Sequence, residues 1–312
     1  MNTTKKTTND IITEQVIAGL ETKGLNWFKP WNDDSSINLP ISYDSKKLYT
    51  GINMLILSNA MSLNGWIRPE FLTFNQITKN GGKVIKGSKS NIVTYWMVSY
   101  LHKPSNKWFN NEKALIAAGY NKNDKEVLAN FTPRFYRVFN IEQTENVKNL
   151  DINIKEVTKG TVFEKIEAAD VVYSNYPSKP ALKHGGNSAY YRPSTDLVQM
   201  PKAEQFVDNA SYYKTLFHEL AHSTGHADRL NRKGVGSMAA SFGSDVYSKE
   251  ELVAEMASMF LVSVTGINPK DSMTNSQAYI NGWISKLKSE PNMIMQAAAQ
   301  SDKAVKHILN VK

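Results

Sequence analysis

The central motif of this chain is His218-Glu219-Leu220-Ala221-His222, which lies within a helix predicted over residues 208–224. Histidines at positions i and i+4 of a helix share one face and lie about 6 Å apart at Cβ. Two imidazoles in that arrangement can bind one zinc ion. The motif therefore predicts a metal site on this helix, with His218 and His222 as ligands.

Glu219 stands between the two histidines and is rotated by about 100° from His218 around the helix axis. This offset lets its carboxylate reach a water molecule beside the metal without becoming a ligand. A metal lowers the pKa of water, and a carboxylate can then take the proton and return it to a leaving group. Glu219 is thus the predicted general base of a metal-dependent hydrolase.

A third metal ligand is required, and several residues compete for that role. Asp228 and His226 follow the motif closely, but Gly225 is expected to end the helix before them. Glu251 lies 29 positions after His222 on the next predicted helix. One turn further on, Glu255 is either a competing ligand or the residue that holds a ligand histidine in place. Glu251 is the favoured ligand, and the alternative is that it serves only as the last residue of a capping box that begins at Ser248.

Composition limits both the kind of protein and the kind of metal site. The 312 residues are 41% hydrophobic and 21% charged, which is typical of a globular protein and long enough for two domains. No apolar run approaches the ~20 residues of a membrane span, and no signal peptide is recognisable, so a cytoplasmic location is expected. The chain has no cysteine, so only histidines and carboxylates can hold a metal.

Charge is unevenly divided along the chain. Residues 1–150 contain 19 Lys and Arg against 12 Asp and Glu, whereas residues 151–312 contain 18 against 17. Nearly all of the net charge of +8 therefore belongs to the first half. A basic half joined to a neutral half indicates two different partners, and phosphate is the obvious partner of the basic one.

Periodicity and composition predict two α+β domains, with domain one over residues 1–145, a charged linker over 146–160 and domain two over 161–312. Domain one is predicted to be a small sheet with helices, its helices at 9–23, 52–61 and 69–79 and its strands at 83–87, 91–101 and 134–141. Domain two is predicted to have an extended edge strand at 190–200 and helices at 161–169, 208–224, 249–264, 277–289 and 291–309.

The order of these segments resembles the ArdC-type antirestriction proteins of conjugative plasmids and other mobile elements. The resemblance runs along almost the whole chain. It rests on Trp27–Trp31, Tyr49–Asn53, Leu72–Gln76, Gly81–Gly87, Phe139–Gln143, Tyr190–Tyr191, Gln199–Pro201, His218–His226, Arg229–Asn231, Glu250–Glu255 and Tyr279–Leu287. One departure is position 88, where an acidic residue is expected and this chain has Ser88. The missing acidic side chain slightly raises the local positive charge.

The resemblance implies an N-terminal domain that binds single-stranded DNA and a C-terminal zincin-like metallopeptidase domain of the glutamate type. Zinc is the expected metal, with Mn²⁺ as an alternative that two histidines and one carboxylate would also accept. Single-strand binding without sequence preference uses lysines along the phosphates and aromatic rings against the bases. The candidates are Trp27, Lys29, Trp31, Tyr49, Lys83, Lys86 and Lys89.

Zincins place an edge strand for extended substrates before the active-site helix, so the resemblance also points to Tyr191 and Arg192 as contacts for a developing oxyanion. The implied function is protection of incoming DNA, with an unidentified host protein as the substrate of the peptidase site. Two alternatives stay open at this point. The metal domain could be structural or inactive in a purely DNA-binding protein, or the chain could be a peptidase unrelated to DNA.

Overall fold

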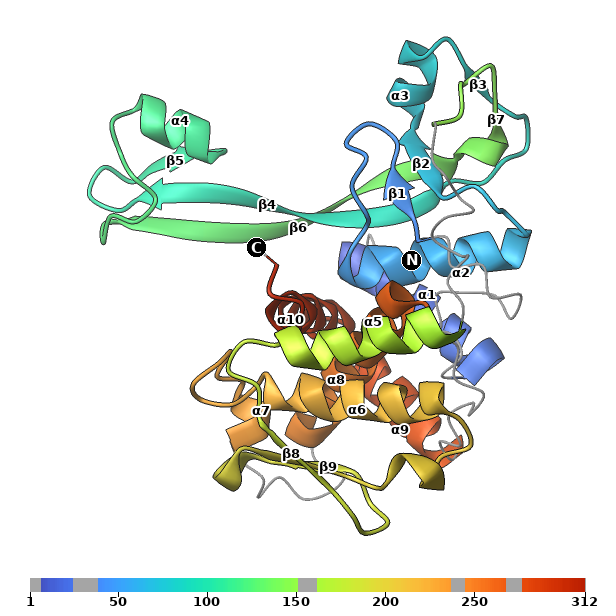
Figure 1. Ribbon diagram of the computed structural model, residues 1–312. Helices are drawn as coiled ribbons and strands as arrows, with labels where there is room; N and C mark the ends of the chain where they lie inside the picture. Colours follow the sequence, from blue (N-terminus) through green and yellow to red (C-terminus); the bar gives the residue numbers. More distant parts are fainter. Residues whose placement is uncertain (1–6, 25–38, 151–161, 237–244, 268–276, 312) are drawn as a thin grey trace.

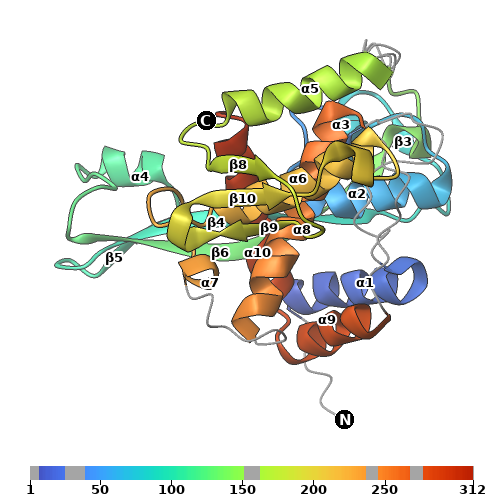
Figure 2. The same cartoon turned by 60° about the horizontal axis from the view of Figure 1, so that its bottom comes forward.

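The structure is a computed structural model that describes residues 7–24, 39–150, 162–236, 245–267 and 277–311. A long two-stranded ribbon projects sideways from a body in which helices are stacked above a small sheet (Figure 1). Turning the molecule brings that small sheet to the front, with the helices behind it (Figure 2). The mixture of helices and sheets confirms the predicted α+β class.

The first half is built around a five-stranded sheet of order β1-β2-β6-β4-β5. Its strands are β1 (Ile41–Ser42), β2 (Glu70–Thr73), β4 (Asn91–His102), β5 (Lys107–Phe109) and β6 (Val127–Asn140). Its helices are α1 (Thr8–Lys23), α2 (Gly51–Asn64), α3 (Phe74–Lys79) and α4 (Glu112–Ala117), and a separate pair of strands is formed by β3 (Lys83–Val84) and β7 (Thr144–Glu145).

The second half combines a three-stranded sheet of order β8-β10-β9 with a stack of helices. The strands are β8 (Ala181–His184), β9 (Tyr190–Arg192) and β10 (Leu197–Met200). The helices are α5 (Val162–Asn175), α6 (Asn209–Ser223), α7 (Lys233–Gly236), α8 (Asp245–Thr265), α9 (Gln277–Ser289) and α10 (Met293–Ile308). None of the helices in the described part of the chain is long and apolar enough to cross a membrane.

Two sequence predictions are corrected by the sheets. The helix expected over residues 69–79 begins only at Phe74, because buried Phe71 and Leu72 pair with β6 as strand β2 and Thr73 then caps α3 with Gln76. The single extended segment expected over 190–200 is two antiparallel strands, of which β9 is an edge strand and β10 is central.

The long strands β4 and β6 form the projecting ribbon. They pair continuously from Asn91↔Val138 to His102↔Val127, so this pairing alone extends for twelve residues. Near the body, the free edge of β4 is closed by Asn53 of α2, whose amide group exchanges hydrogen bonds of 2.7 Å with the backbone N–H and carbonyl of Thr94. Further out, β5 and α4 cover the tip (Figure 1).

The largest hydrophobic core contains residues from both halves of the chain. Ile12 and Leu20 of α1 and Met54 of α2 belong to the same buried cluster as Leu216 of α6 and Ile294 of α10. Helix α1 packs on α9, and α2 packs on α10. Helices α1 and α2 of the first half therefore complete the core that carries the metal-binding motif.

Candidate metal centre

Helix α6 positions the two histidines of the central motif. The Asp208 side chain caps it by accepting a hydrogen bond of 2.7 Å from the Ser211 N–H, and the buried Leu216 and Leu220 hold the helix against α8. The imidazoles of His218 and His222, one turn apart, approach each other so closely that their Nε2 atoms lie 3.1 Å apart. This confirms the expected sharing of one helical face.

Helix α8 places Glu251 opposite the histidines. Its Oε2 lies 3.5 Å from His218 Nε2 and its Oε1 lies 3.4 Å from His222 Nε2. In a tetrahedral site with metal–ligand bonds of about 2.0–2.2 Å, neighbouring ligand atoms lie roughly 3.3–3.6 Å apart. His218, His222 and Glu251 therefore present their donor atoms close to the spacing of three corners of such a site, and the chemistry of this donor set fits zinc or manganese.

The other candidates for the third ligand are differently placed. Asp228 is 87% exposed at its side chain, and its carboxylate pairs with Nδ1 of His226, 3.6 Å away. The Glu255 carboxylate lies 3.3 Å from Nδ1 of His218, on the opposite side of the ring from the converging Nε2. The geometry therefore favours Glu251 as the ligand and Glu255 as the partner that orients His218.

His222 has an orienting partner of its own that the sequence analysis missed. Its Nδ1 lies 3.2 Å from Oε1 of Glu250, the residue next to Glu251. Carboxylates commonly hold the second nitrogen of metal-binding histidines and so fix the tautomer of the ring. In the sequence, the pair Glu250-Glu251 was a possible signal, because neighbouring helical positions point in different directions and can serve two different histidines.

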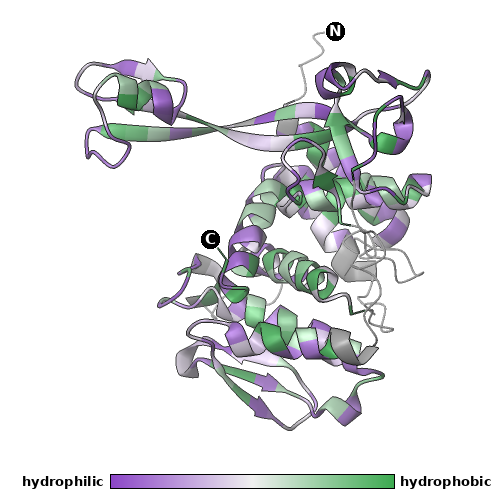
Figure 3. Cartoon of the chain, turned by 45° about the horizontal axis from the view of Figure 1, so that its top comes forward, coloured by the Kyte–Doolittle hydropathy of each residue, from purple (hydrophilic) through white to green (hydrophobic). Residues whose placement is uncertain are grey.

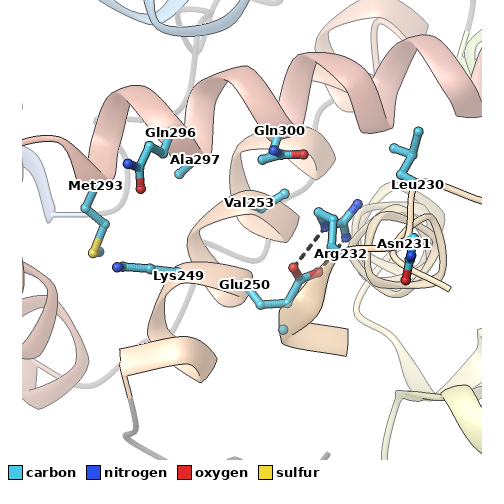
Figure 4. A pocket seen from close by; sticks show the side chains of 11 residues that line it. Leu230, Asn231, Arg232, Lys249, Glu250, Val253, Met293, Gln296, Ala297 and Gln300 are labelled. Atoms are coloured by element: carbon cyan, nitrogen blue, oxygen red, sulfur yellow. Dashed lines mark hydrogen bonds and ion pairs between the residues drawn. The ribbon is translucent and has the colours of Figure 1, made fainter. Parts of the chain in front are cut away.

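Arg232 completes this arrangement from the segment between α6 and α8. Its guanidinium donates two hydrogen bonds to Glu250, of 2.9 Å and 2.5 Å, in a buried ion pair (Figure 4). It also donates to the Ala221 carbonyl at 2.8 Å and to the Thr224 hydroxyl at 2.5 Å. One side chain thus joins the end of α6 to α8, and together with Glu250 it borders a pocket of about 460 Å³.

The electrostatics of the three candidate ligands follow from their mutual contacts. Burial alone would lower the pKa of both histidines. Hydrogen bonds to Glu251 and Glu255 nevertheless raise the pKa of His218 well above its ordinary value. Hydrogen bonds to Glu250 and Glu251 raise the pKa of His222 to about 9. Burial would raise the pKa of Glu251, but the two imidazoles hold it well below its ordinary range. The site therefore holds Glu251 as a carboxylate.

Glu219 is buried on α6, with 8% of its surface exposed. Its negative charge contributes to the raised pKa of the neighbouring His218, which places it within the electrostatic reach of the site. The described contacts assign it neither a position among the converging ligand atoms nor a hydrogen-bond partner. That placement is compatible with the predicted role as a base, which stays a prediction.

The structure does not support an oxyanion contact from Tyr191. Its side chain is buried, and its hydroxyl donates a 2.8 Å hydrogen bond to Asp196 and accepts one of 3.1 Å from Arg229. Burial and the hydrogen bond to Asp196 raise the pKa of this hydroxyl. Arg192 is exposed and contacts the Tyr190 hydroxyl at 2.9 Å. Tyr191 therefore packs the β9–β10 turn against Arg229.

The residues predicted to contact DNA divide into four groups. Trp27, Lys29 and Trp31 lie outside the described residues. Tyr49 is buried against Phe71, so its ring offers no free face for a base, which corrects that prediction. Lys83 is exposed and pairs with Glu145 at 2.8 Å.

The remaining two, Lys86 and Lys89, are exposed in one turn beside a hollow of about 690 Å³. Among the described residues, neither has an acidic partner. These two lysines are therefore available to an external anion.

Comparison with known proteins follows the same division into two halves. Residues 6–139 match the family described as the N-terminal domain of anti-restriction factor ArdC, and residues 168–300 match the family described as a zincin-like metallopeptidase. Crystal structures of the antirestriction ArdC protein from plasmid R388, one Mn(II)-bound and one metal-free, cover 98% of this chain at TM-scores of 0.70, with 26% and 25% identity. The matched regions make up 98% of the Mn(II)-bound ArdC chain and 100% of the metal-free one.

Sequence relatives extend over nearly the whole chain. Two Escherichia coli proteins named DNA primase TraC are each 32% identical over 310 residues, which is 98% of this chain. The chain spans only 20% and 27% of their lengths. The protein y4eC of Sinorhizobium fredii is 29% identical over 302 residues, 96% of this chain and 91% of that protein. With an ArdC N-terminal domain followed by a zincin-like metallopeptidase domain, the chain belongs to the ArdC-type antirestriction family.

Proposed function

We propose that this protein is an antirestriction protein of a mobile element that binds single-stranded DNA and hydrolyses peptide bonds at a divalent-metal site. The observation that carries the peptidase half is the convergence of His218 Nε2, His222 Nε2 and the Glu251 carboxylate within 3.1–3.5 Å of one another. We place the protein in the cytoplasm, where incoming DNA would meet it.

The chemistry of the site divides between the metal and the chain. A bound divalent ion, zinc or manganese, supplies Lewis-acid polarisation of a water molecule and of a substrate carbonyl. Glu219 takes the proton from the attacking water and returns it to the amine that leaves. Glu250 and Glu255 orient the two imidazoles through their Nδ1 atoms and keep the proton there, which leaves each Nε2 lone pair for the metal.

A host protein is the proposed substrate of this site. Strand β9 is an edge strand of its sheet and packs against α6, so an extended peptide could pair with its free edge near the motif. The DNA-binding half of the proposal is supported by the excess of positive charge in residues 1–150 and by the ArdC-type N-terminal domain.

Metal content tests the metal site on which the peptidase half of this proposal depends. The purified full chain should contain one divalent ion, His222→Ala should contain none, and Glu219→Gln should keep the ion because Glu219 is not a ligand. Asp228→Asn is the matched control for loss of a nearby carboxylate and should keep the ion as well. Absence of metal from the wild type after incubation with zinc or manganese would contradict the proposal.

Activity then distinguishes a peptidase from a structural metal domain. With casein as a general probe, Glu219→Gln should lower the rate by about 10²–10⁴-fold, the usual contribution of a general base. The same variant should bind oligonucleotides as the wild type does. If Glu219→Gln protects transferred DNA in a restricting host as well as the wild type does, the metal domain is structural in that function.

A further inference from the structure

The β4–β6 ribbon exposes large aromatic side chains on one of its faces. Trp96, Phe131 and Phe135 are 45%, 60% and 41% exposed. In the antiparallel pairing Phe135 lies opposite Thr94, Trp96 opposite Pro133 and Phe131 opposite Val98. Directly opposed residues point to the same face, and every second pair along a ribbon shares that face. The three rings therefore form one row, here called the aromatic row.

Both ends of this face are covered, whereas the middle is open. At the tip, Tyr100 of the same face is buried with Phe109 and Leu115 beneath α4. At the base, Ile92 packs against the main core. Hydrophobic segments nevertheless continue along the ribbon where it lies clear of the helices (Figure 3). Neighbouring exposed aromatic rings of this kind mark an interaction surface.

Positive charge accompanies the aromatic row. Residues 91–102 and 127–140 contain no Asp or Glu, and of their two arginines Arg134 lies opposite Tyr95 on the other face. Arg137 lies opposite Ile92 on the same face as the row, and its Nη1 donates a 3.2 Å hydrogen bond to the Ser90 hydroxyl. Ser90 in turn lines the hollow that contains Lys86 and Lys89. The basic turn and the aromatic row are thus joined through Arg137.

The basic turn is held in a defined conformation. The Gln143 side-chain amide donates a 3.0 Å hydrogen bond to the Lys89 carbonyl, and the Ile85 N–H donates one of 2.9 Å to the Gln143 carbonyl. Glu142, the acidic residue of the hollow, accepts two hydrogen bonds of 2.7 Å from the backbone N–H groups of Ile67 and Arg68. The Glu142 carboxylate is therefore already bound by backbone N–H groups.

We propose that the aromatic row stacks the bases of single-stranded DNA whose phosphates are bound by Arg137, Lys86 and Lys89. This inference rests on the proposed function and assigns its surface. A row of rings with cations at one end, on strands without acidic side chains, fits a chain of unpaired bases and phosphates. A duplex fits poorly because its bases are already stacked inside. The ribbon and the small sheet lie on opposite sides of α6 and α10 (Figure 1).

The test uses the full chain, a fluorescein-labelled oligothymidylate and fluorescence anisotropy. A double variant, Trp96→Ala with Phe135→Ala, should bind the oligonucleotide much more weakly, since each stacking ring is worth roughly 5- to 100-fold in affinity. The matched control is Trp108→Ala with Leu128→Ala, two similarly exposed residues on the opposite face of the ribbon. This control should bind as the wild type does.

A second readout addresses the phosphate contacts. In Lys86→Gln with Lys89→Gln, the slope of log affinity against log salt should become shallower by about 0.7 for each lost contact, the value for single strands. Conservative Trp96→Phe should retain most of the affinity because the ring remains. Thermal unfolding and metal content should match the wild type in all these variants, which excludes a general loss of fold.

The outcomes separate this inference from the broader proposal. If the wild type binds and the aromatic-row variant binds equally well, the inference is wrong while single-strand binding stands. The same holds if the opposite-face control loses affinity to the same extent. If the folded wild type shows no binding of single strands even at low salt, both the inference and the DNA-binding half of the proposed function fail.

Discussion

Arg232 and Glu250 form a buried ion pair that meets the candidate metal centre at His222. Removing one member of such a pair leaves an uncompensated charge. We expect Glu250→Gln to weaken zinc binding by about 10- to 100-fold, the usual effect of losing the partner of a ligand histidine. Competition with a chromophoric chelator measures this. Affinity equal to the wild type would contradict the orienting role of Glu250.

A second prediction at the residue scale concerns pH. In the metal-free protein the pKa of His222 is raised to about 9, above the ordinary ~6.5 of an unfolded chain. The resulting stabilisation is complete below about pH 6.5 and is lost as the pH rises towards 9. We therefore expect the melting temperature of the metal-free protein to fall over this range. The zinc-bound form should not show this fall, because metal replaces the proton. Parallel curves for the two forms would contradict this account.

At the scale of elements, the end of α6 depends on close contact with the segment that follows it. A Cβ at Gly225 would lie 2.4 Å from Cγ2 of Val235 and 3.2 Å from Cζ of Arg232. Gly225→Ala should therefore lower the free energy of unfolding by about 1–3 kcal/mol, as overpacking does. Gly282 in α9 has no neighbour within 4 Å of such a Cβ. Gly282→Ala should stabilise the protein by about 0.5–1 kcal/mol. Chemical denaturation of both variants would test the contrast, and equal effects would contradict it.

The elements themselves differed in how far local sequence determined them. The strand over residues 91–101 was predicted nearly to its ends because its β-branched and aromatic residues favour a strand locally. The motif helix was predicted equally well because its apolar residues repeat with the helical period. Strand β2 was mistaken for helix because its buried residues gain their stability from pairing with β6, some seventy positions away. The full length of β6 was missed for the same reason.

At the scale of the whole molecule, the first helices and the metal domain share one core. The Thr13 hydroxyl in α1 donates a 2.6 Å hydrogen bond to the Pro291 carbonyl, and α2 packs on α10. We therefore expect thermal unfolding of the full chain to be one cooperative transition, and a fragment of residues 161–312 to lose stability because apolar faces of α9 and α10 become exposed. Calorimetry of both would check this. Two separate transitions, or a fragment that melts with the full chain, would contradict the shared core.

The predicted boundary between residues 1–145 and 161–312 is still a prediction, and the single core does not depend on it. A change in composition can reveal where a linker lies, but it carries no information about which helices pack together afterwards. That packing depends on the apolar faces of α1 and α2 meeting those of α9 and α10, more than 200 residues later in the chain.

The amino-acid sequence by itself determined the chemistry of this protein: two histidines one helical turn apart, a glutamate between them, an acidic helix downstream and a basic first half. These are properties of residue type and short-range spacing, which helix geometry translates directly into position. Only the tertiary structure brought the Glu251 carboxylate beside both histidines, added Glu250 and Arg232, and placed Tyr49 and Tyr191 in the interior. Those outcomes depend on how distant elements pack, because burial and distance between separate elements are set by the whole core.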